Sequence, residues 1–201
     1  MSTLAFDLGN VICPFDYKIA FARTGTRMEA SGERVLQALF YEEFGSDYER
    51  GLLSTAEFYE KARSSFGFSL SLDDFKDIWS DIFSLNEGTV SLLRALKEKG
   101  HSLYMLSNIC ELHHEFLLKK FPGAFEHFND LILSYQAGAI KPEKKIYDVL
   151  CERSANSPEN IIYIDDRIDL IEASRKMGFK AVLFKDITQC ERELSAYGVE
   201  W

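Results

Sequence analysis

Five polar residues of this chain follow short apolar runs that have the composition of buried strands. They are Asp7 after residues 4–6, Ser107 after 103–106, Lys141 in the loop after 131–134, and Asp165 with Asp166 after 161–164. The carboxyl ends of parallel strands lie at one edge of a sheet, where α/β proteins bind their ligands. We therefore expect these side chains to meet at one site. Asp7 alone has a second interpretation, as the cap of a turn between strand and helix.

This set of groups suits phosphoryl transfer. A carboxylate such as Asp7 can attack phosphorus and form an aspartyl phosphate, which divides the hydrolysis into two displacements. Three clustered carboxylates repel one another unless a cation lies among them, and Mg²⁺ prefers carboxylate and water oxygens. The same cation would neutralise phosphate oxygens. Lys141 would pair with the carboxylates and the transferring group, while Ser107 and the backbone around Asn108 would donate hydrogen bonds to phosphate.

The strands that must position these groups alternate with helical patterns. The five expected strands are residues 4–6, 103–106, 131–134, 161–164 and 181–184, and the helices between them are 89–99, 111–120, a segment through 146–150, and 170–177. Strands separated in this way form parallel sheets with helices on both faces. Right-handed crossovers then give an α/β fold with a Rossmann-like, doubly wound core.

A long helical region interrupts this alternation after the first strand. From about residue 16 to 85 apolar residues recur at spacings of three and four, as at Val35, Leu36, Leu39 and Phe40. No alternating strand pattern occurs there. We interpret the region as an insertion that covers another part of the protein.

Within the insertion, local signals mark helix starts and a possible overhang. Ser54 with Glu57 has the pattern of a capping box, and Ser71 precedes another helix start. Most of the dense aromatic residues are expected to pack between short helices. They are Phe40, Tyr41, Phe44, Tyr48, Phe58, Tyr59, Phe66, Phe68, Phe75, Trp79 and Phe83. The polar segment 48–51, which ends in glycine, is the best candidate to overhang a site.

Composition indicates an ordinary globular protein. The chain has 201 residues, 46% hydrophobic and 27% charged, and a formal net charge of -9. That charge argues against nucleic acid or an anionic membrane as partner. Four scattered cysteines, Cys13, Cys110, Cys151 and Cys190, form no zinc-type pair and are expected to be free thiols of a cytoplasmic protein. No secretory signal or membrane-spanning run is evident, and the sequence makes no prediction of oligomeric state.

Four motifs in order resemble those of the haloacid dehalogenase superfamily. They are Phe6-Asp7-Leu8-Gly9-Asn10, Leu106-Ser107-Asn108, Lys141-Pro142 and Ile164-Asp165-Asp166. The context also resembles the subgroup that contains bacterial glucose-1-phosphate phosphatase and the amino-terminal phosphatase domain of soluble epoxide hydrolase. The shared features are Asp-Leu-Gly-Asn-Val-Ile, the Glu49-Arg50-Gly51 turn, and the run from Ser134 through Gly138 to Lys141-Pro142.

The resemblance implies a division of the chain and a role for each residue. Residues 1–13 and 88–201 would form the catalytic core, and residues 14–87 a helical cap that selects the substrate and excludes water. Its implied site residues are Asp7 as nucleophile and metal ligand, the Gly9 carbonyl and Asp166 as further Mg²⁺ ligands, Asp165 in support, Ser107 and Lys141 as catalytic groups, and Asn10, Ser107 and Asn108 as substrate-binding groups. The expected activity is hydrolysis of a small phosphorylated metabolite, with a sugar phosphate as the favoured substrate.

Two positions depart from the family pattern. Phosphatases of this superfamily usually carry an acid/base aspartate two residues after the nucleophile, where this chain has Gly9. An anomeric leaving group would need that acid less, although acid catalysis usually contributes about 10²–10⁴-fold. Glucose-1-phosphate phosphatase resembles this chain in the same substitution. Leu170 stands where asparagine or aspartate often supports the metal ligands.

These departures leave two alternatives to a phosphatase. A dehalogenase also lacks the second aspartate but needs no metal, whereas the Asp165-Asp166 pair fits metal binding. A catalytically silent protein could instead bind a phosphorylated ligand or a protein partner.

Other polar residues near the same edge are less promising. His113 and His114 are adjacent on a helix, so they point in different directions, and we favour a surface role. Cys110 lacks a histidine partner by spacing and is expected to be a buried or incidental thiol. Lys144 and Lys145 are expected on a solvated helix face.

Overall fold

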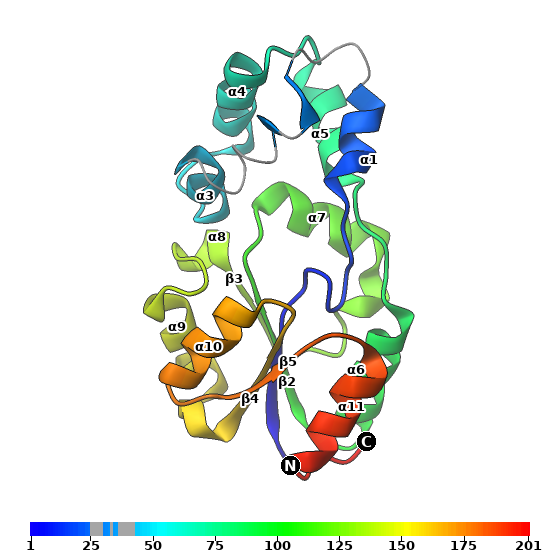
Figure 1. Cartoon of the computed structure of the whole chain (residues 1–201), viewed down its shortest axis with the longest axis vertical. Coiled ribbons are helices and arrows are strands. Elements are labelled where there is room, and N and C mark those ends of the chain that lie inside the picture. Colours follow the sequence, from blue (N-terminus) through cyan, green and yellow to red (C-terminus); the bar gives the residue numbers. More distant parts are fainter. Residues whose placement is uncertain (25–29, 33, 36–42) are drawn as a thin grey trace.

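Five parallel strands form one sheet in the computed structural model, which describes residues 1–24, 30–32, 34–35 and 43–201 (Figure 1). The strands are β1 (Thr3–Phe6), β2 (Ser102–Ser107), β3 (Asp130–Leu133), β4 (Ile161–Asp165) and β5 (Lys180–Leu183). Their order is β3-β2-β1-β4-β5, and each neighbouring pair is parallel. The chain thus builds outward from β1 on one side and then crosses to the other, which confirms the doubly wound α/β fold.

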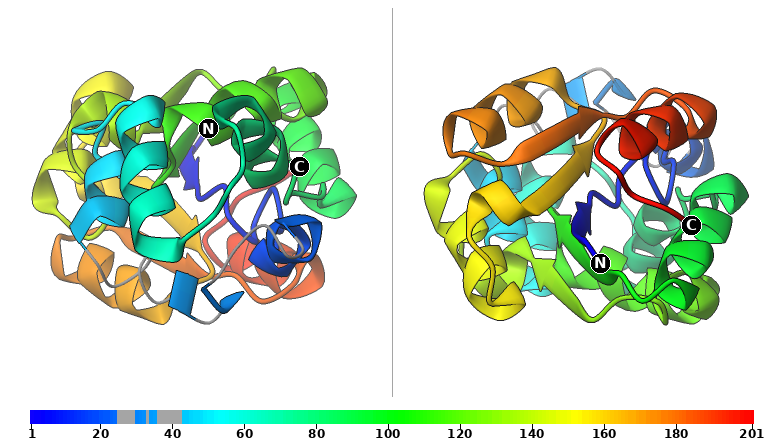
Figure 2. Two further views of the ribbon diagram at one scale, coloured as in Figure 1. Left: turned by 90° about the horizontal axis from the view of Figure 1, so that it is seen from above. Right: turned by 90° about the horizontal axis from the view of Figure 1, so that it is seen from below.

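Helices cover both faces of the sheet. Figure 1 shows α9 (Lys144–Ser154) and α10 (Ile168–Lys176) on one face, with α6 (Glu87–Glu98) and α11 (Ile187–Ala196) on the other, and Figure 2 shows the same layers from the two ends. The remaining core elements are α7 (Glu111–Lys120), α8 (Ser134–Ala137), and the 3₁₀ turns η2 (Pro122–Ala124) and η3 (Pro158–Asn160).

Alternating strand residues enter two separate cores. In β1, Leu4 and Phe6 belong to the larger core, which includes Leu93 of α6. Ala5 points the other way and belongs to the smaller core, with Leu150 of α9 and Ile171 of α10. Because successive strand side chains point to opposite faces, Asp7 lies on the same face as Ala5.

A layer of helices lies beyond the carboxyl ends of the strands. The described helices between β1 and α6 are α1 (Tyr17–Thr24), α3 (Glu43–Glu49), α4 (Thr55–Phe66) and α5 (Leu72–Ser80), here called the helical layer. The chain enters and leaves the layer through neighbouring segments, because Phe15 bridges Phe83 and the Asn86 amide donates to the Ile12 carbonyl at 2.9 Å.

Local signals begin the helices of the layer as predicted. Ser54 Oγ accepts from the Glu57 amide at 3.3 Å, and Glu57 Oε2 accepts from the Ser54 amide at 2.8 Å, which completes the capping box of α4. Ser71 caps α5 in the same way, accepting from the Asp74 amide at 3.1 Å.

Aromatic stacking holds the helical layer together. Phe58 stacks on Tyr48 with ring centroids 4.2 Å apart, and Phe75 stacks on Trp79 at 5.2 Å. All four rings are buried, so the predicted packing role is confirmed for them. The helix expected through residues 36–40, with Leu36, Leu39 and Phe40, and the expected role of Tyr41 lie outside the described residues.

The structure corrects one predicted strand. Ser134 was expected to end the third strand, but it is the first residue of α8, and its Oγ donates to the Glu49 carbonyl at 2.6 Å. The apolar run 131–134 did not reveal this turn, because the hydroxyl's partner lies far away in the sequence.

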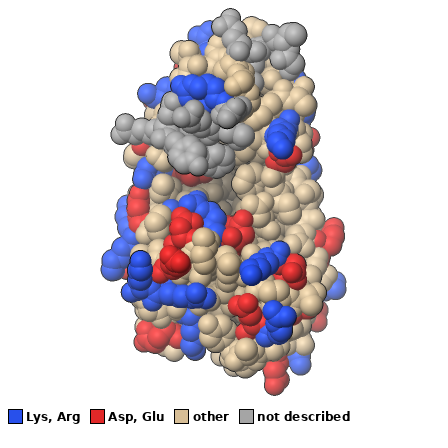
Figure 3. Space-filling view, viewed as in Figure 1, with Lys and Arg blue, Asp and Glu red and all other residues tan. Residues whose placement is uncertain are grey.

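Charges of both signs are dispersed over one face of the molecule. Among the described residues on the face shown in Figure 3, acidic and basic side chains are interspersed and form no extended patch of one sign. Among the described residues, no helix is long and apolar enough to cross a membrane.

Candidate functional site

The reversal of strand order at β1 places Asp7 and Asp165 next to each other. β1 and β4 are hydrogen-bonded neighbours, with Ala5 opposite Tyr163, and the Asp7 amide donates to the Ile164 carbonyl at 2.8 Å. Asp165 is the last residue of β4, two residues after Tyr163, so it shares the face on which Asp7 lies. Ligand sites in open α/β sheets form at this kind of switch point.

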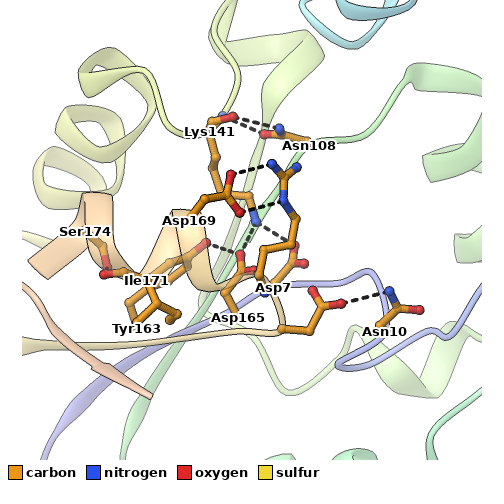
Figure 4. Close-up of polar contacts among 11 residues, drawn as sticks. Asp7, Asn10, Asn108, Lys141, Tyr163, Asp165, Asp169, Ile171 and Ser174 are labelled. Atoms are coloured by element: carbon orange, nitrogen blue, oxygen red, sulfur yellow. Dashed lines mark hydrogen bonds and ion pairs between the residues drawn. The ribbon is translucent and has the colours of Figure 1, made fainter. Parts of the chain in front are cut away.

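Lys141 lies between these two carboxylates (Figure 4). Its Nζ donates to Asp7 Oδ1 at 2.7 Å and to Asp165 Oδ2 at 2.8 Å, and only 3% of the lysine is exposed. Burial disfavours the ammonium, but the two carboxylates hold the pKa of Lys141 above its ordinary value. Burial raises the pKa of Asp7 to about 7, although Lys141 opposes the shift. The cluster therefore holds an ammonium and carboxylate groups where water solvates them poorly.

Both carboxylate oxygens of Asp165 accept hydrogen bonds from protein donors. Besides Lys141, it accepts hydrogen bonds from the Tyr163 hydroxyl and from the Arg167 amide, the latter at 2.8 Å. The residue is fully buried. Its geometry suits the orientation of Lys141 better than direct contact with a ligand. Tyr163 was not predicted as a site residue, although its spacing of two from Asp165 on one strand could have revealed it.

The loop that carries Lys141 is held by Asn108. The Asn108 Oδ1 accepts from the Lys141 amide at 2.7 Å, and its Nδ2 donates to the Lys141 carbonyl at 3.1 Å. Asn108 thus connects the end of β2 to the loop after β3. It also lines a cavity to which Asp7 and Lys141 contribute. Ser107 is buried beside it and lines an adjoining cavity together with Gly9.

Asn10 orients the third carboxylate. With a φ of 57°, Asn10 turns so that its Nδ2 donates to Asp166 Oδ2 at 2.9 Å (Figure 4). Burial raises the pKa of Asp166, whereas this hydrogen bond lowers it. Leu170 is buried and lines the same cavity without a polar group. Asn10 therefore supports Asp166 from the opposite loop.

The three carboxylates fit a divalent cation. Oxygens of Asp7, Asp165 and Asp166 all lie within 4.8 Å of one another. Because Asp165 is already satisfied, Asp7 and Asp166 are the side chains that could hold a cation such as Mg²⁺. The Gly9 carbonyl accepts from the Val11 amide at 2.7 Å, and a carbonyl oxygen can accept a second interaction.

An open cavity of about 190 Å³ lies above this cluster, and its volume is suited to a small ligand. It brings together the sequence-predicted residues Asp7, Gly9, Asn10, Asn108, Lys141 and Asp166. Four further lining residues were not predicted as site residues: Phe15, Glu49, Arg167 and Leu170. The polar segment 48–51 had indicated an overhang, and Glu49 is the member of that segment that reaches the cavity.

Arg50 and Gly51 hold the helical layer against the elements that follow β3. Arg50 Nη2 donates to Glu143 Oε1 at 2.5 Å, and α3 packs against α8. Gly51 has a φ of +72°, and a Cβ there would lie 2.3 Å from the Tyr135 carbonyl oxygen. Glycine is therefore required at this junction for two separate reasons.

Replacing Gly51 with alanine should destabilise the protein more than the same change at Gly198. Both glycines have positive φ, at +72° and +75°, but an added Cβ at Gly198 meets nothing within 4 Å. We expect about 1 kcal/mol from backbone strain at either position, and a further 1–3 kcal/mol or so from overpacking at Gly51. Urea unfolding of both variants measures the difference, and equal losses would contradict the steric argument.

The histidines were expected on the surface, and that prediction is wrong. His113 and His114 are 6% and 8% exposed. His113 Nε2 lies 3.1 Å from the Trp79 carbonyl, and burial lowers the pKa of His113 to about 4, so the ring is neutral and donates. His114 Nδ1 lies 3.1 Å from the Tyr135 hydroxyl. Both histidines connect α7 to neighbouring elements, a role that helix periodicity alone did not reveal.

The remaining minor predictions agree with the structure. Cys110 is buried, and burial raises the pKa of its thiol to about 12. Lys144 and Lys145 are exposed on α9, and Lys144 pairs with Asp148 at 2.5 Å.

The site thus consists of an open parallel sheet with a buried lysine between two carboxylates at its switch point. The chain belongs to the haloacid dehalogenase-like hydrolase family, which it matches over residues 1–178. The family resemblance inferred from the four motifs is thus confirmed, and the protein is a hydrolase.

The sequence identity to individual relatives is low. The chain is 25% identical over 194 residues to D-ribitol-5-phosphate phosphatase from Bacteroides thetaiotaomicron, and the match covers 90% of each protein. It is 29% identical over 114 residues to bifunctional epoxide hydrolase 2 from Rattus norvegicus, a match that covers 55% of this chain and 21% of that protein. Its fold is similar to that of a haloacid dehalogenase family enzyme from Bacteroides thetaiotaomicron, solved with magnesium and inorganic phosphate. That comparison has a TM-score of 0.82 at 24% identity and covers 92% of this chain and 94% of the other.

Proposed function

We propose that this protein is a Mg²⁺-dependent phosphatase that hydrolyses a small phosphorylated metabolite through an aspartyl phosphate on Asp7. The observation that carries the proposal is the ammonium of Lys141 between Asp7 and Asp165, beside Asp166, at the floor of the cavity. A carboxylate nucleophile, a fixed cation and a further carboxylate are the groups that such a displacement needs.

Each residue has a role in the proposed reaction. Asp7 Oδ2 attacks phosphorus, because Oδ1 is held by Lys141. Lys141 stabilises negative charge as it develops on the transferring phosphoryl group, and Asp165 keeps its ammonium in place. Ser107 and Asn108 bind the phosphate at the carboxyl end of β2. Asn10 binds phosphate as well and orients Asp166.

The donor set is appropriate for magnesium. Asp7, Asp166 and the Gly9 carbonyl would hold the ion, with water completing its coordination. When bound, Mg²⁺ supplies positive charge that neutralises phosphate oxygens. This assignment is consistent with the magnesium and phosphate in the similar structure from Bacteroides thetaiotaomicron.

The proposed substrate class is a sugar phosphate or sugar-alcohol phosphate. Its support is the similarity to D-ribitol-5-phosphate phosphatase along 90% of each chain. We also propose that residues 14–87 form a cap over a core made of residues 1–13 and 88–201. The cap would contribute Phe15 and Glu49 to the cavity and so select the leaving group.

Changing Asp166 to asparagine should weaken Mg²⁺ binding by more than about 100-fold, since an outer-shell partner alone contributes about 10–100-fold. Phosphate release at low Mg²⁺ should fall accordingly and recover partly at high Mg²⁺. Calorimetric titration with Mg²⁺ and a phosphate-release assay across a panel of phosphate esters measure both effects. Asp148→Asn, on the exposed face of α9, is the matched control and should titrate like the wild type.

The same assay separates the rival functions. Excess chelator should abolish phosphate release from every ester in the panel. Chloride release from a haloacid that persists in chelator would support a dehalogenase instead. A wild-type protein that turns over no ester in the presence of Mg²⁺ would contradict the proposal and support a binding protein.

A further inference from the structure

The position that usually carries the acid/base is crowded by an aromatic side chain in this protein. A Cβ on Gly9 would lie 3.0 Å from Phe15 Cε1 and 3.8 Å from Asp7 Oδ2. A shift of Phe15 would change its ring contacts, which are edge-on with Tyr17 at 5.7 Å and tilted with Phe83 at 6.0 Å between centroids. An aromatic ring therefore occupies the space beside the nucleophile that an acidic side chain at position 9 would enter.

A different carboxylate reaches the same space from above. Glu49, the last residue of α3, lines the cavity that contains Asp7, Gly9 and Lys141. It also lines the two adjoining cavities under the helical layer, one with Ser107 and the other with Trp79. Glu49 thus lies where the phosphate site meets the space available for a leaving group.

The backbone of Glu49 is held in place while its carboxylate is not. Ser134 Oγ donates to the Glu49 carbonyl at 2.6 Å, and the next residue, Arg50, is paired with Glu143. Within the part of the chain that the structure describes, no group forms a hydrogen bond or ion pair with the Glu49 carboxylate. Glu49 is half-buried and lines the cavity, so its carboxylate is available to a ligand there.

The electrostatic surroundings suit proton transfer near neutral pH. Burial raises the pKa of Glu49 to about 7, against the opposing positive charges of Lys141, Arg167 and Arg50. A group with such a pKa can donate a proton in one step and accept one in the next.

We propose that Glu49 is the general acid and general base of the reaction, an inference that rests on the proposed phosphatase function. As Asp7 attacks phosphorus and the ester P–O bond breaks, the Glu49 carboxylic acid gives its proton to the leaving oxygen, which departs as the alcohol. The Glu49 carboxylate then takes a proton from the water that attacks the aspartyl phosphate. Hydrogen phosphate leaves, Asp7 is regenerated, and Glu49 is again protonated.

The test compares leaving groups in Glu49→Gln. With an alkyl phosphate, whose alkoxide must be protonated, we expect single-turnover cleavage to slow by about 10²–10⁴-fold. With 4-nitrophenyl phosphate, whose phenolate leaves without a proton, the first turnover should stay within a few-fold of wild type. A burst of nitrophenolate should then precede slow turnover, and a phosphorylated protein should accumulate in intact-mass spectra, because water is no longer activated.

Two variants control for structural effects. Glu60→Gln makes the same change on α4, where Glu60 is exposed and pairs with Arg63, and it should leave both substrates unaffected. Glu49→Asp should restore part of the alkyl phosphate activity. Thermal unfolding establishes that each variant is folded. A loss of local structure alone would slow the first turnover of both substrates by the same factor.

The outcomes separate the two proposals. If the wild type hydrolyses phosphate esters and Glu49→Gln behaves like it, or slows the first turnover of both substrates by one factor, the role of Glu49 is overturned while the phosphatase function stands. If the wild type releases no phosphate from any ester, both proposals fall.

Discussion

Replacing Asp7 with asparagine is expected to lower phosphate release from any ester by at least about 10⁴-fold. The amide oxygen of asparagine is a poor nucleophile, and the aspartyl phosphate cannot form. The introduced amide would still offer an oxygen to Lys141, so the geometry of the cluster should persist. Phosphate release and the absence of a phosphorylated protein in intact-mass spectra measure the loss.

The folding stability of Asp7→Asn shows whether a loss of activity comes from unfolding. Burial raises the pKa of Asp7 to about 7, so the ionised carboxylate destabilises the folded state above that pH. The neutral amide removes this charge, and Asp7→Asn should be at least as stable as wild type at pH 8. Asp77→Asn, an exposed change on α5, should leave activity unaltered. Residual turnover above about one percent would indicate another nucleophile and contradict the assignment.

Replacing Lys141 with methionine should remove activity and also destabilise the fold. Its Nζ is the shared partner of Asp7 and Asp165, and loss of one member of such a buried set typically costs about 3–5 kcal/mol. Catalysis should fall by about 10²–10³-fold or more, because the fixed positive charge at the phosphoryl group is lost. Urea unfolding in chelator and phosphate release with Mg²⁺ measure the two effects.

The stability loss of Lys141→Met should depend on pH. Without the ammonium, the pKa of Asp7 rises further above its unfolded value of about 4. A carboxyl raised in this way stabilises the fold most below its unfolded pKa, and this contribution disappears as pH rises through its folded pKa. The deficit should therefore be larger at pH 8 than at pH 5. Lys144→Met, on the exposed face of α9, should change stability by less than about 0.5 kcal/mol at either pH. A pH-independent deficit would show that packing, not charge, is responsible.

The sequence by itself determined the core of the fold and the identity of the cluster. Apolar runs of strand length separated by helical periodicity left a parallel, doubly wound sheet as the consistent arrangement. In such a sheet the strand ends meet, so Asp7, Lys141 and Asp165 could be brought together from their positions along the chain alone. Boundaries failed where a partner lies far away in the sequence, as for Ser134, whose hydroxyl bonds to the Glu49 carbonyl.

Only the tertiary structure decided how these groups are connected. The clamp of Asn108 on the Lys141 backbone and the hydrogen bond from Asn10 to Asp166 join loops that no local pattern relates. Burial, which sequence periodicity estimated wrongly for His113 and His114, is set by elements that pack from outside their helix.

Gly9 shows the division most clearly. In the sequence it is a missing acid. In the structure, Phe15 fills the space beside it, and Glu49 reaches the same cavity from a helix that begins more than thirty residues later. Steric crowding and long-range packing are properties of the folded chain, so the sequence identified the missing acid but could not name the residue proposed to replace it.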